Sequence, residues 1–215
     1  MARHDSGLPE PDVPEGTRDR IKAVAAELYV LRGHEGFSFG DIAAAIGTTR
    51  ANIHHHFGSK QQLMRELIED IASNAEARIE RYWRAGSATF SERLALQLHD
   101  LRRYYDRFNR GDGDRNVWSP LSRLRHDLPT LGNEAVDALE RVNRTYDLCL
   151  GHAIGEAVTA GELRPGTDVG DVVRVLRVTL LSCPPMTQDF GRFEEIELLF
   201  RALARLVSAT GDPQG

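Results

Sequence analysis

The stretch IAAAIGTTRANIHHHFGSKQQL, residues 42–63, joins a short apolar run, a glycine and a polar segment with three consecutive histidines. The alanine-rich run predicts a helix of about two turns that ends at Gly47. Thr49 is a typical N-cap for a second short helix, in which Ile53 and Phe57 lie four residues apart and face the core. This order predicts a helix-turn-helix arrangement.

The flanking residues predict two longer helices around this unit. An apolar stripe begins after Thr17 and closes at Gly33, as in an amphipathic helix. Ser38, with Asp41 three residues later, resembles a capping box for the first short helix. Ser59 can cap a longer helix that follows the histidines. Four helices are therefore expected before residue 86.

The rest of the chain has helical periodicity and no strand-like alternation. The helix that follows the cap Asp168 is expected to end at Pro184 and Pro185, because proline lacks the N–H that a helix needs. We therefore predict an all-α protein of about nine helices, with an N-terminal helix-turn-helix domain and a larger C-terminal helical domain. Apolar stripes mark its later helices near residues 94–108, 136–153, 169–182 and 193–206.

Composition and charge restrict the function. The chain has 215 residues, of which 41% are hydrophobic and 27% charged, and a net charge of −5. This balance is typical of a globular protein and argues against one that coats nucleic acid nonspecifically. However, residues 47–65 contain no acidic side chain, so a basic face can exist locally.

The histidine run does not predict a metal site or an active site. Successive helical residues lie about 100° apart, so His54, His55 and His56 cannot close on one ion. No nucleophile–base signature or phosphate loop accompanies them, so we expect no catalytic residue, metal or cofactor. A small helical hydrolase that uses these histidines remains the alternative from another class of protein.

The location and the cysteines also follow from the sequence. No apolar run approaches the roughly 18 residues of a membrane span, and the start lacks a signal-peptide core, so a cytoplasmic protein without a membrane partner is expected. Cys149 and Cys183 stand in apolar helical sequence and are expected to be buried thiols rather than zinc ligands or a disulfide.

Residues 42–63 resemble the N-terminal domain of the TetR family of transcriptional regulators, and the motif covers about a quarter of the chain. Thr48 stands where the family usually has an aliphatic residue, and His54 where it usually has tyrosine. The all-helical remainder is also similar to the family. The positions that match the motif are Ile42, Ala43, Gly47, Thr49, Phe57, Ser59, Lys60 and Leu63.

A recognition helix presents its first side chains to base edges in the major groove, so Arg50 can pair with guanine and Asn52 with adenine. The other polar residues are better placed for phosphates. Capping is the alternative role of Ser38 and Thr49, and an ordinary solvated surface is the alternative for Arg50, Asn52 and Lys60. The predicted DNA-binding residues are Ser38, Thr48, Thr49, Arg50, Asn52, His54, His55 and Lys60.

The resemblance implies that the C-terminal helices bind a small-molecule effector and form a homodimer. A mostly apolar effector is expected at Tyr105, Trp118, Leu121, Tyr146, Cys149 and Met186. The dimer interface is expected at Leu176, Thr179, Leu180, Leu199, Leu203 and Leu206. Ordinary core packing is the alternative for both sets.

The expected domains are a flexible arm (1–16), a DNA-binding domain (17–62), a ligand-binding and dimerisation domain (63–210) and a flexible tail (211–215). The expected function is a repressor that a small molecule releases from a pseudo-palindromic operator in double-stranded DNA. The alternative is a regulator of the same fold that is constitutive or controlled by a partner protein.

Overall fold

The computed structural model describes residues 16–109 and 116–209, which fold into ten α-helices. These residues contain no strand, and an isolated bridge joins Leu163 to Ser208. The all-α prediction is confirmed, with α7 as a four-residue helix beyond the nine expected. The helices are α1 Thr17–Arg32, α2 Phe39–Ile46, α3 Arg50–Phe57, α4 Lys60–Trp83, α5 Phe90–Phe108, α6 Pro120–His126, α7 Leu128–Leu131, α8 Asn133–Thr159, α9 Val169–Phe190 and α10 Glu194–Val207.

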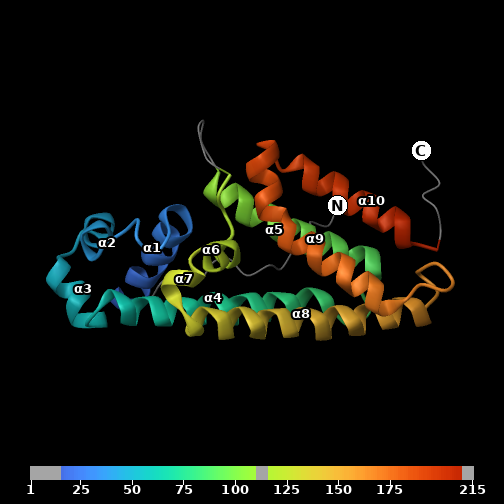
Figure 1. The fold of residues 1–215 in the computed structure, drawn as a ribbon, viewed down its shortest axis with the longest axis horizontal. Coiled ribbons are helices and arrows are strands. Elements are labelled where there is room, and N and C mark those ends of the chain that lie inside the picture. The colour runs from blue at the N-terminus through green and yellow to red at the C-terminus, as the bar shows by residue number, and fades with distance from the viewer. Residues whose placement is uncertain (1–15, 110–115, 210–215) are drawn as a thin grey trace, which may run out of the picture.

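Two long helices, α4 and α8, lie side by side and run in the same direction along the length of the molecule (Figure 1). Helices α1 to α3 gather at the N-terminal end of α4, whereas α5, α9 and α10 lie towards its C-terminal end. The boundary expected between residues 62 and 63 falls inside α4, so this helix belongs to both parts. The expected arm and tail lie outside the described residues, except for Gly16.

Side-chain caps begin several helices where the sequence predicts them. Ser38 accepts a hydrogen bond from the backbone N–H of Asp41, whose carboxylate bonds back to it in a full capping box. Thr49, Ser59 and Asp168 each accept a hydrogen bond from the backbone N–H three residues later. These local bonds fix the start of α2, α3, α4 and α9.

The expected end of α9 is wrong, because the helix continues through Pro184 and Pro185 to its end at Phe190. Side-chain bonds and burial hold this region together. The buried Thr187 hydroxyl donates to the carbonyl of Pro184 at 2.9 Å and accepts from the Trp118 indole N–H at 2.8 Å. Tertiary packing therefore offsets the helical hydrogen bonds that the two prolines cannot make.

Cys149 and Cys183 are both buried and free, as expected from their apolar surroundings. Burial raises the pKa of both thiols, that of Cys183 to about 12. Such thiols remain protonated and are poor nucleophiles.

None of the helices in the described ranges combines the length and apolarity needed to cross a bilayer.

Candidate functional site

The short helix α3 is held by its apolar side. Ile53 and Phe57 are buried, and Gly47 ends α2 in the left-handed conformation with φ of 70°. The backbone N–H of Thr48 donates to the carbonyl of Ala43 at 3.0 Å and closes the turn. Because its buried side is anchored in this way, α3 presents its opposite side to solvent.

The exposed side of α3 is polar and free of carboxylates. Thr49, Arg50, His54 and His55 are exposed, whereas Asn52 is half-buried. In the described ranges no carboxylate forms an ion pair with Arg50. The guanidinium of Arg50 is therefore available to a negatively charged partner.

Hydrogen bonds connect the turn to the first residues of α3. The Thr49 hydroxyl accepts from the backbone N–H of Asn52 at 3.1 Å, and the Asn52 side-chain amide donates to the Thr48 hydroxyl at 3.0 Å. Asn52 retains a second amide hydrogen, which an adenine contact would require. The turn thus orients Asn52 before any partner binds.

The three histidines point in different directions. His54 and His55 are exposed and His56 is half-buried, as the helical spacing indicates. The ring of His54 lies edge-on to Phe39, with centroids 6.5 Å apart. Residues 16–109 and 116–209 contain no cluster of three potential metal-binding side chains.

Ser38 is exposed but engaged in the cap of α2. Its hydroxyl donates to the Asp41 carboxylate at 2.6 Å, and its backbone N–H donates to the same oxygen at 2.8 Å. These bonds hold the pKa of Asp41 below its ordinary value. A phosphate contact by the Ser38 hydroxyl would therefore compete with this cap.

Lys60 has a different environment from the one expected for a phosphate contact. Its ammonium donates to the backbone carbonyls of His34 and Phe37, the latter at 2.6 Å, and lies 4.5 Å from the centre of the Phe37 ring. Burial lowers the pKa of Lys60. Two of its three N–H groups therefore hold the loop between α1 and α2, and the geometry favours a structural role.

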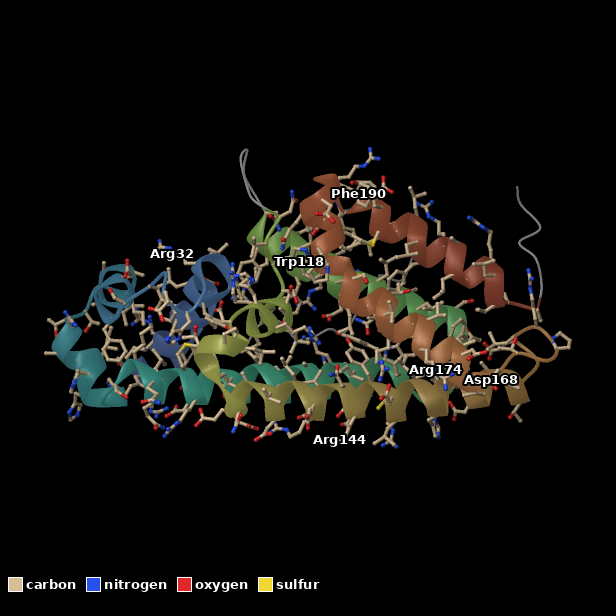
Figure 2. The ribbon with its side chains drawn as sticks, viewed as in Figure 1. Arg32, Trp118, Arg144, Asp168, Arg174 and Phe190 are labelled. Atoms are coloured by element: carbon tan, nitrogen blue, oxygen red, sulfur yellow. The ribbon has the colours of Figure 1, made fainter. Side chains whose placement is uncertain are left out.

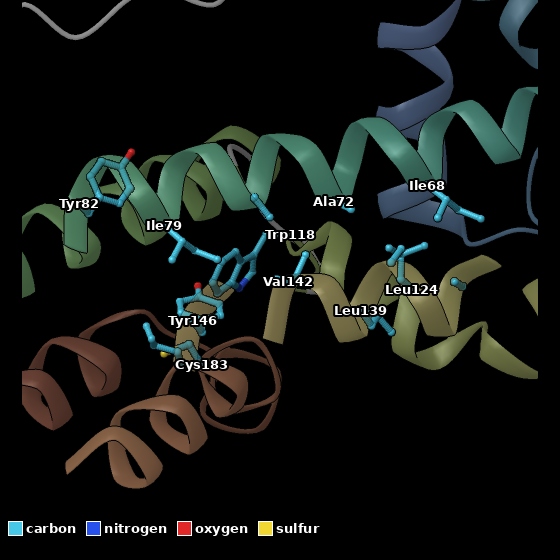
Figure 3. Close-up of a cluster of buried hydrophobic side chains, with 14 of the residues drawn as sticks. Ile68, Ala72, Ile79, Tyr82, Trp118, Leu124, Leu139, Val142, Tyr146 and Cys183 are labelled. Atoms are coloured by element: carbon cyan, nitrogen blue, oxygen red, sulfur yellow. The ribbon is translucent and has the colours of Figure 1, made fainter. Parts of the chain in front are cut away.

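A second candidate site is a cavity of about 60 Å³ among α4, α5, α6, α8 and α9. Of the predicted effector residues, Trp118, Leu121 and Tyr146 line it. Figure 3 shows Trp118 and Tyr146 close together beside α4, and Figure 2 shows Trp118 inside the bundle. Tyr105 packs on Trp118 with ring centroids 6.4 Å apart, outside the lining.

Cys149 and Met186 do not line this cavity either. Cys149 is buried in α8, and Met186 is half-buried in α9. Periodicity places both residues on helices of the C-terminal part but cannot say which side chains border the empty space. The predicted set therefore divides into three lining residues and three that pack elsewhere.

The cavity also contains charged residues that the apolar pattern does not predict. Arg78 donates to Asp100 at 3.2 Å and to the Tyr104 hydroxyl at 2.8 Å, while Asp100 also accepts from Tyr82 at 3.0 Å. Arg125 lines the same space. A signal was present in the sequence, because Arg78 interrupts the apolar face of α4.

A larger cleft of about 780 Å³ lies next to this cavity, between α1, α4, α5 and α6. Arg78, Tyr104, Pro120 and Leu121 line both spaces. An ion pair of 2.6 Å between Arg107 and Glu27 joins α5 to α1 at the cleft. The two parts of the molecule thus meet beside the cavity.

Most of the residues predicted for the dimer interface are buried within the protomer. Leu176, Thr179, Leu180 and Leu203 are buried and Leu199 is half-buried, so the core covers them. Only Leu206 is well exposed, at 68%. The large apolar side chains that do face solvent on α9 and α10 are Val175, Val178, Phe190, Leu198 and Leu206.

Comparison with known proteins gives a consistent picture. A family model described as bacterial regulatory proteins, tetR family, matches residues 21–67. The HTH-type transcriptional repressor KstR2 of Mycolicibacterium smegmatis is 23% identical over 169 residues, which are 79% of this chain and 78% of that protein. The repressor LfrR of the same organism is 32% identical over 76 residues, 34% of this chain and 40% of that one.

Solved structures share the fold over nearly the whole chain. A TetR-family transcriptional regulator from Agrobacterium tumefaciens has a TM-score of 0.74 at 20% identity and covers 92% of this chain and 100% of its own. The reduced form of NemR from E. coli has a TM-score of 0.72 at 15% identity, with 91% and 99% covered.

Proposed function

This chain belongs to the TetR family of bacterial regulatory proteins, and on that premise we propose that it is a homodimeric repressor released from its operator by a small molecule. Proteins of this family bind DNA and are not enzymes, so the histidine run is not an active site. Two relatives are named as repressors, which supports this direction of regulation. A regulator of chromosomal DNA acts in the cytoplasm, and this location is part of the proposal.

The observation that carries the proposal is the exposed, carboxylate-free start of α3. Arg50 and Asn52 stand at the N-terminal end of a helix whose other side is anchored in the core. A helix in this position can enter the major groove and read base edges. We assign base contacts to Arg50 and Asn52, and backbone contacts to Thr48, Thr49, His54 and His55, with Ser38 as a further one.

Operator binding can be tested with duplexes taken from the DNA that flanks this protein's coding sequence, since such regulators often control neighbouring genes. Fluorescence anisotropy and footprinting should find one protected pseudo-palindrome with half-sites one helical turn apart, about 34 to 36 Å, or at a related spacing. Binding to all duplexes with equal affinity would contradict a sequence-specific regulator.

We place the dimer interface on the solvent side of α9 and α10. Val175 and Val178 stand three residues apart on α9, and Leu198 and Leu206 stand about two turns apart on α10. Branched apolar side chains in such a row lose contact with water when a second copy covers them. The two recognition helices would then be fixed at one spacing.

The variant Val178→Glu/Leu206→Glu should dissociate the dimer, because it would bury unpaired charges in an apolar interface. Sedimentation should show a folded monomer, and operator affinity should fall by at least about 100-fold. Leu31→Glu, an equally drastic change at an exposed leucine of α1, should leave the dimer intact. A dimer that survives the double change would locate the interface elsewhere.

Helix α6 lies beside α1 of the DNA-binding part (Figure 1), and it also lines the cavity. Leu121 and Arg125 line the cavity, whereas Arg123 donates to the carbonyl of Val30 at 3.1 Å and Asp127 accepts from the backbone N–H of His34 at 2.8 Å. An effector that moves α6 would therefore shift α1. It can favour the released state only by its greater affinity for that state.

This route predicts a variant in which effector binding no longer leads to full operator release. Arg123→Met removes the bond from α6 to α1 but does not alter the cavity lining. The variant should bind its effector with unchanged affinity, and the effector should release the operator less completely. If the effector released the variant as completely as the parent, this route would be excluded. If no small molecule changed operator binding by the parent chain, the constitutive or partner-controlled alternative would be favoured.

A further inference from the structure

The cavity among α4, α5, α6, α8 and α9 has an excess of positive charge. Its lining includes two guanidinium groups, those of Arg78 and Arg125, but only one carboxylate, that of Asp100. Charged side chains are rarely buried without an opposite charge. Asp100 can neutralise only one of the two guanidinium groups, and its contacts show which one.

Both carboxylate oxygens of Asp100 bond to neighbours on one side of the cavity. One carboxylate oxygen accepts from the Tyr82 hydroxyl at 3.0 Å, and the other accepts from Arg78 at 3.2 Å. Arg78 completes its own bonding with the hydroxyl of Tyr104 at 2.8 Å. This group is neutral overall and leaves no carboxylate for a second cation.

Arg125 lacks such a partner. Its Nη2 atom is buried without a hydrogen bond, and no ion pair to Arg125 occurs in residues 16–109 and 116–209. Burial lowers the pKa of its guanidinium, with Tyr146 as the nearby polar group that opposes this shift. Arg125 as a whole is half-buried, but its buried, unpaired nitrogen costs free energy, which an anion from outside the chain would recover.

The other walls indicate what this anion carries. Trp118, Leu121, Tyr146 and Leu180 provide aromatic and aliphatic surface around the guanidinium. The cavity of about 60 Å³ has room for several waters or a short organic group. A carboxylate matches the planar guanidinium in shape and in its single charge, whereas a phosphate dianion carries two negative charges and Arg125 supplies only one positive charge.

We propose that this cavity is an anion site that binds a small monocarboxylic acid, with its carboxylate on Arg125 and its apolar body against Trp118 and Leu180. The inference rests on the proposed function, because it names the chemical class of the effector. It also revises the expected effector, which now has one negative charge beside an apolar body. A longer body could extend towards the larger cleft past Leu121, which lines both spaces.

The test compares carboxylates with neutral molecules of the same shape. The full chain, without DNA, is titrated with butyrate, hexanoate and benzoate and with the corresponding primary amides at equal ionic strength in chloride buffer. Melting temperature and tryptophan fluorescence are recorded, since Trp118 lines the site. At least one carboxylate should give a saturable upshift and a fluorescence change at concentrations where its amide gives neither. Equal responses to each acid and its amide, or no response to any acid, would overturn the proposal.

Three variants locate the effect. Arg125→Met keeps a similar side-chain volume without the charge, and it should weaken carboxylate binding by at least about tenfold while the ligand-free protein melts at the same or a higher temperature. Arg125→Lys keeps the charge and should bind with intermediate affinity, which provides a second measurement if the methionine variant folds poorly. Arg103→Met, at an exposed arginine of α5, should bind as the parent does. Undiminished carboxylate binding by Arg125→Met would refute the assignment.

The outcome can be separated from that of the proposed function, because these titrations contain no DNA. Operator release is measured independently by anisotropy. Release by an uncharged molecule, together with no response to carboxylates, would overturn the anion site and leave the regulator intact. Carboxylate binding that depends on Arg125 would support the anion site even in a chain whose operator affinity does not change.

Discussion

Arg50 on α3 and Arg125 on α6 are the same kind of side chain in opposite surroundings. Arg50 is exposed at the start of its helix, where water solvates the guanidinium until a partner arrives. Arg125 has a buried, unpaired nitrogen inside the C-terminal bundle. Water solvates an exposed guanidinium at little cost in free energy, whereas a buried nitrogen without a hydrogen bond destabilises the unliganded protein.

This difference indicates how the two sites can act. The surface site can offer its charge to DNA without any change of fold, so its contribution is to binding. In the cavity, a bound anion would pair with Arg125 and so raise the stability of the folded protein. Polar residues of the N-terminal part should therefore affect operator affinity, and those of the cavity should affect stability first.

The largest effect is expected at Asp100, whose carboxylate pairs with Arg78 in the cavity. Asp100→Asn would leave Arg78 without its counter-charge, in addition to Arg125, which has none in the parent protein, and we expect a loss of about 3 to 5 kcal/mol in the free energy of unfolding. Urea denaturation measures it. Glu140→Gln, which breaks the exposed pair with Arg144, should cost less than about 0.5 kcal/mol. Similar losses in both variants would remove the distinction between buried and exposed charge.

Arg50→Ala should separate binding from stability. Operator affinity should fall by about 1 to 3 kcal/mol with relaxed preference at one symmetric base position, while the melting temperature stays unchanged. Arg144→Ala is the matched control, because Figure 2 shows Arg144 pointing away from α8 into solvent. If Arg50→Ala weakens binding to operator and random DNA equally, Arg50 contacts only phosphate.

Lys60 provides a further test, because it is half-buried and its ammonium bonds to backbone carbonyls. Lys60→Ala removes the bonds to the carbonyls of His34 and Phe37, so we expect stability to fall by about 1 to 2 kcal/mol. The slope of operator affinity against salt should change by well under one unit. A slope reduced by about 0.9 per contact, with unchanged stability, would instead establish the phosphate contact that the motif predicts.

The smallest effect concerns a partly exposed ion pair of the N-terminal part. Arg18 donates two hydrogen bonds of 2.6 Å to Glu66, and these bonds hold the pKa of Glu66 below its ordinary value. A lowered pKa in the folded state adds stability above the unfolded pKa, and this contribution disappears as pH falls through the folded pKa. Glu66→Gln should therefore lower stability slightly at pH 7 and flatten its decline below about pH 4.5. Urea midpoints between pH 3 and 7 would show no difference in slope if the pair were irrelevant.

Local features of the DNA-binding end could be predicted from the sequence. The caps Ser38, Thr49 and Ser59 bond to backbone groups three residues away, and Gly47 ends α2 through its own conformation. Interactions over three or four residues leave a pattern in the sequence itself. For this reason the helix-turn-helix and the all-α fold could be predicted from the sequence.

Other features depended on packing between distant segments. Periodicity marks the apolar faces of α9 and α10 but cannot tell whether the protomer's own core or a second copy covers them. For this reason Leu176 and Leu203 were predicted at the dimer interface, whereas both are buried in the core of the protomer. The passage of α9 through Pro184 depends on bonds from Thr187 and Trp118, and Trp118 is 69 residues from Thr187.

The sequence by itself determined the helical class, the order of the longer helices and the polar face of α3, because each rests on neighbours within about one helical turn. Only the tertiary structure decided that Lys60 reaches back to the loop after α1 and that Arg78, Asp100 and Arg125, from three different helices, share one cavity. The physical reason is that the cost of a buried charge depends on every group around it. Those groups come together only when the chain has folded.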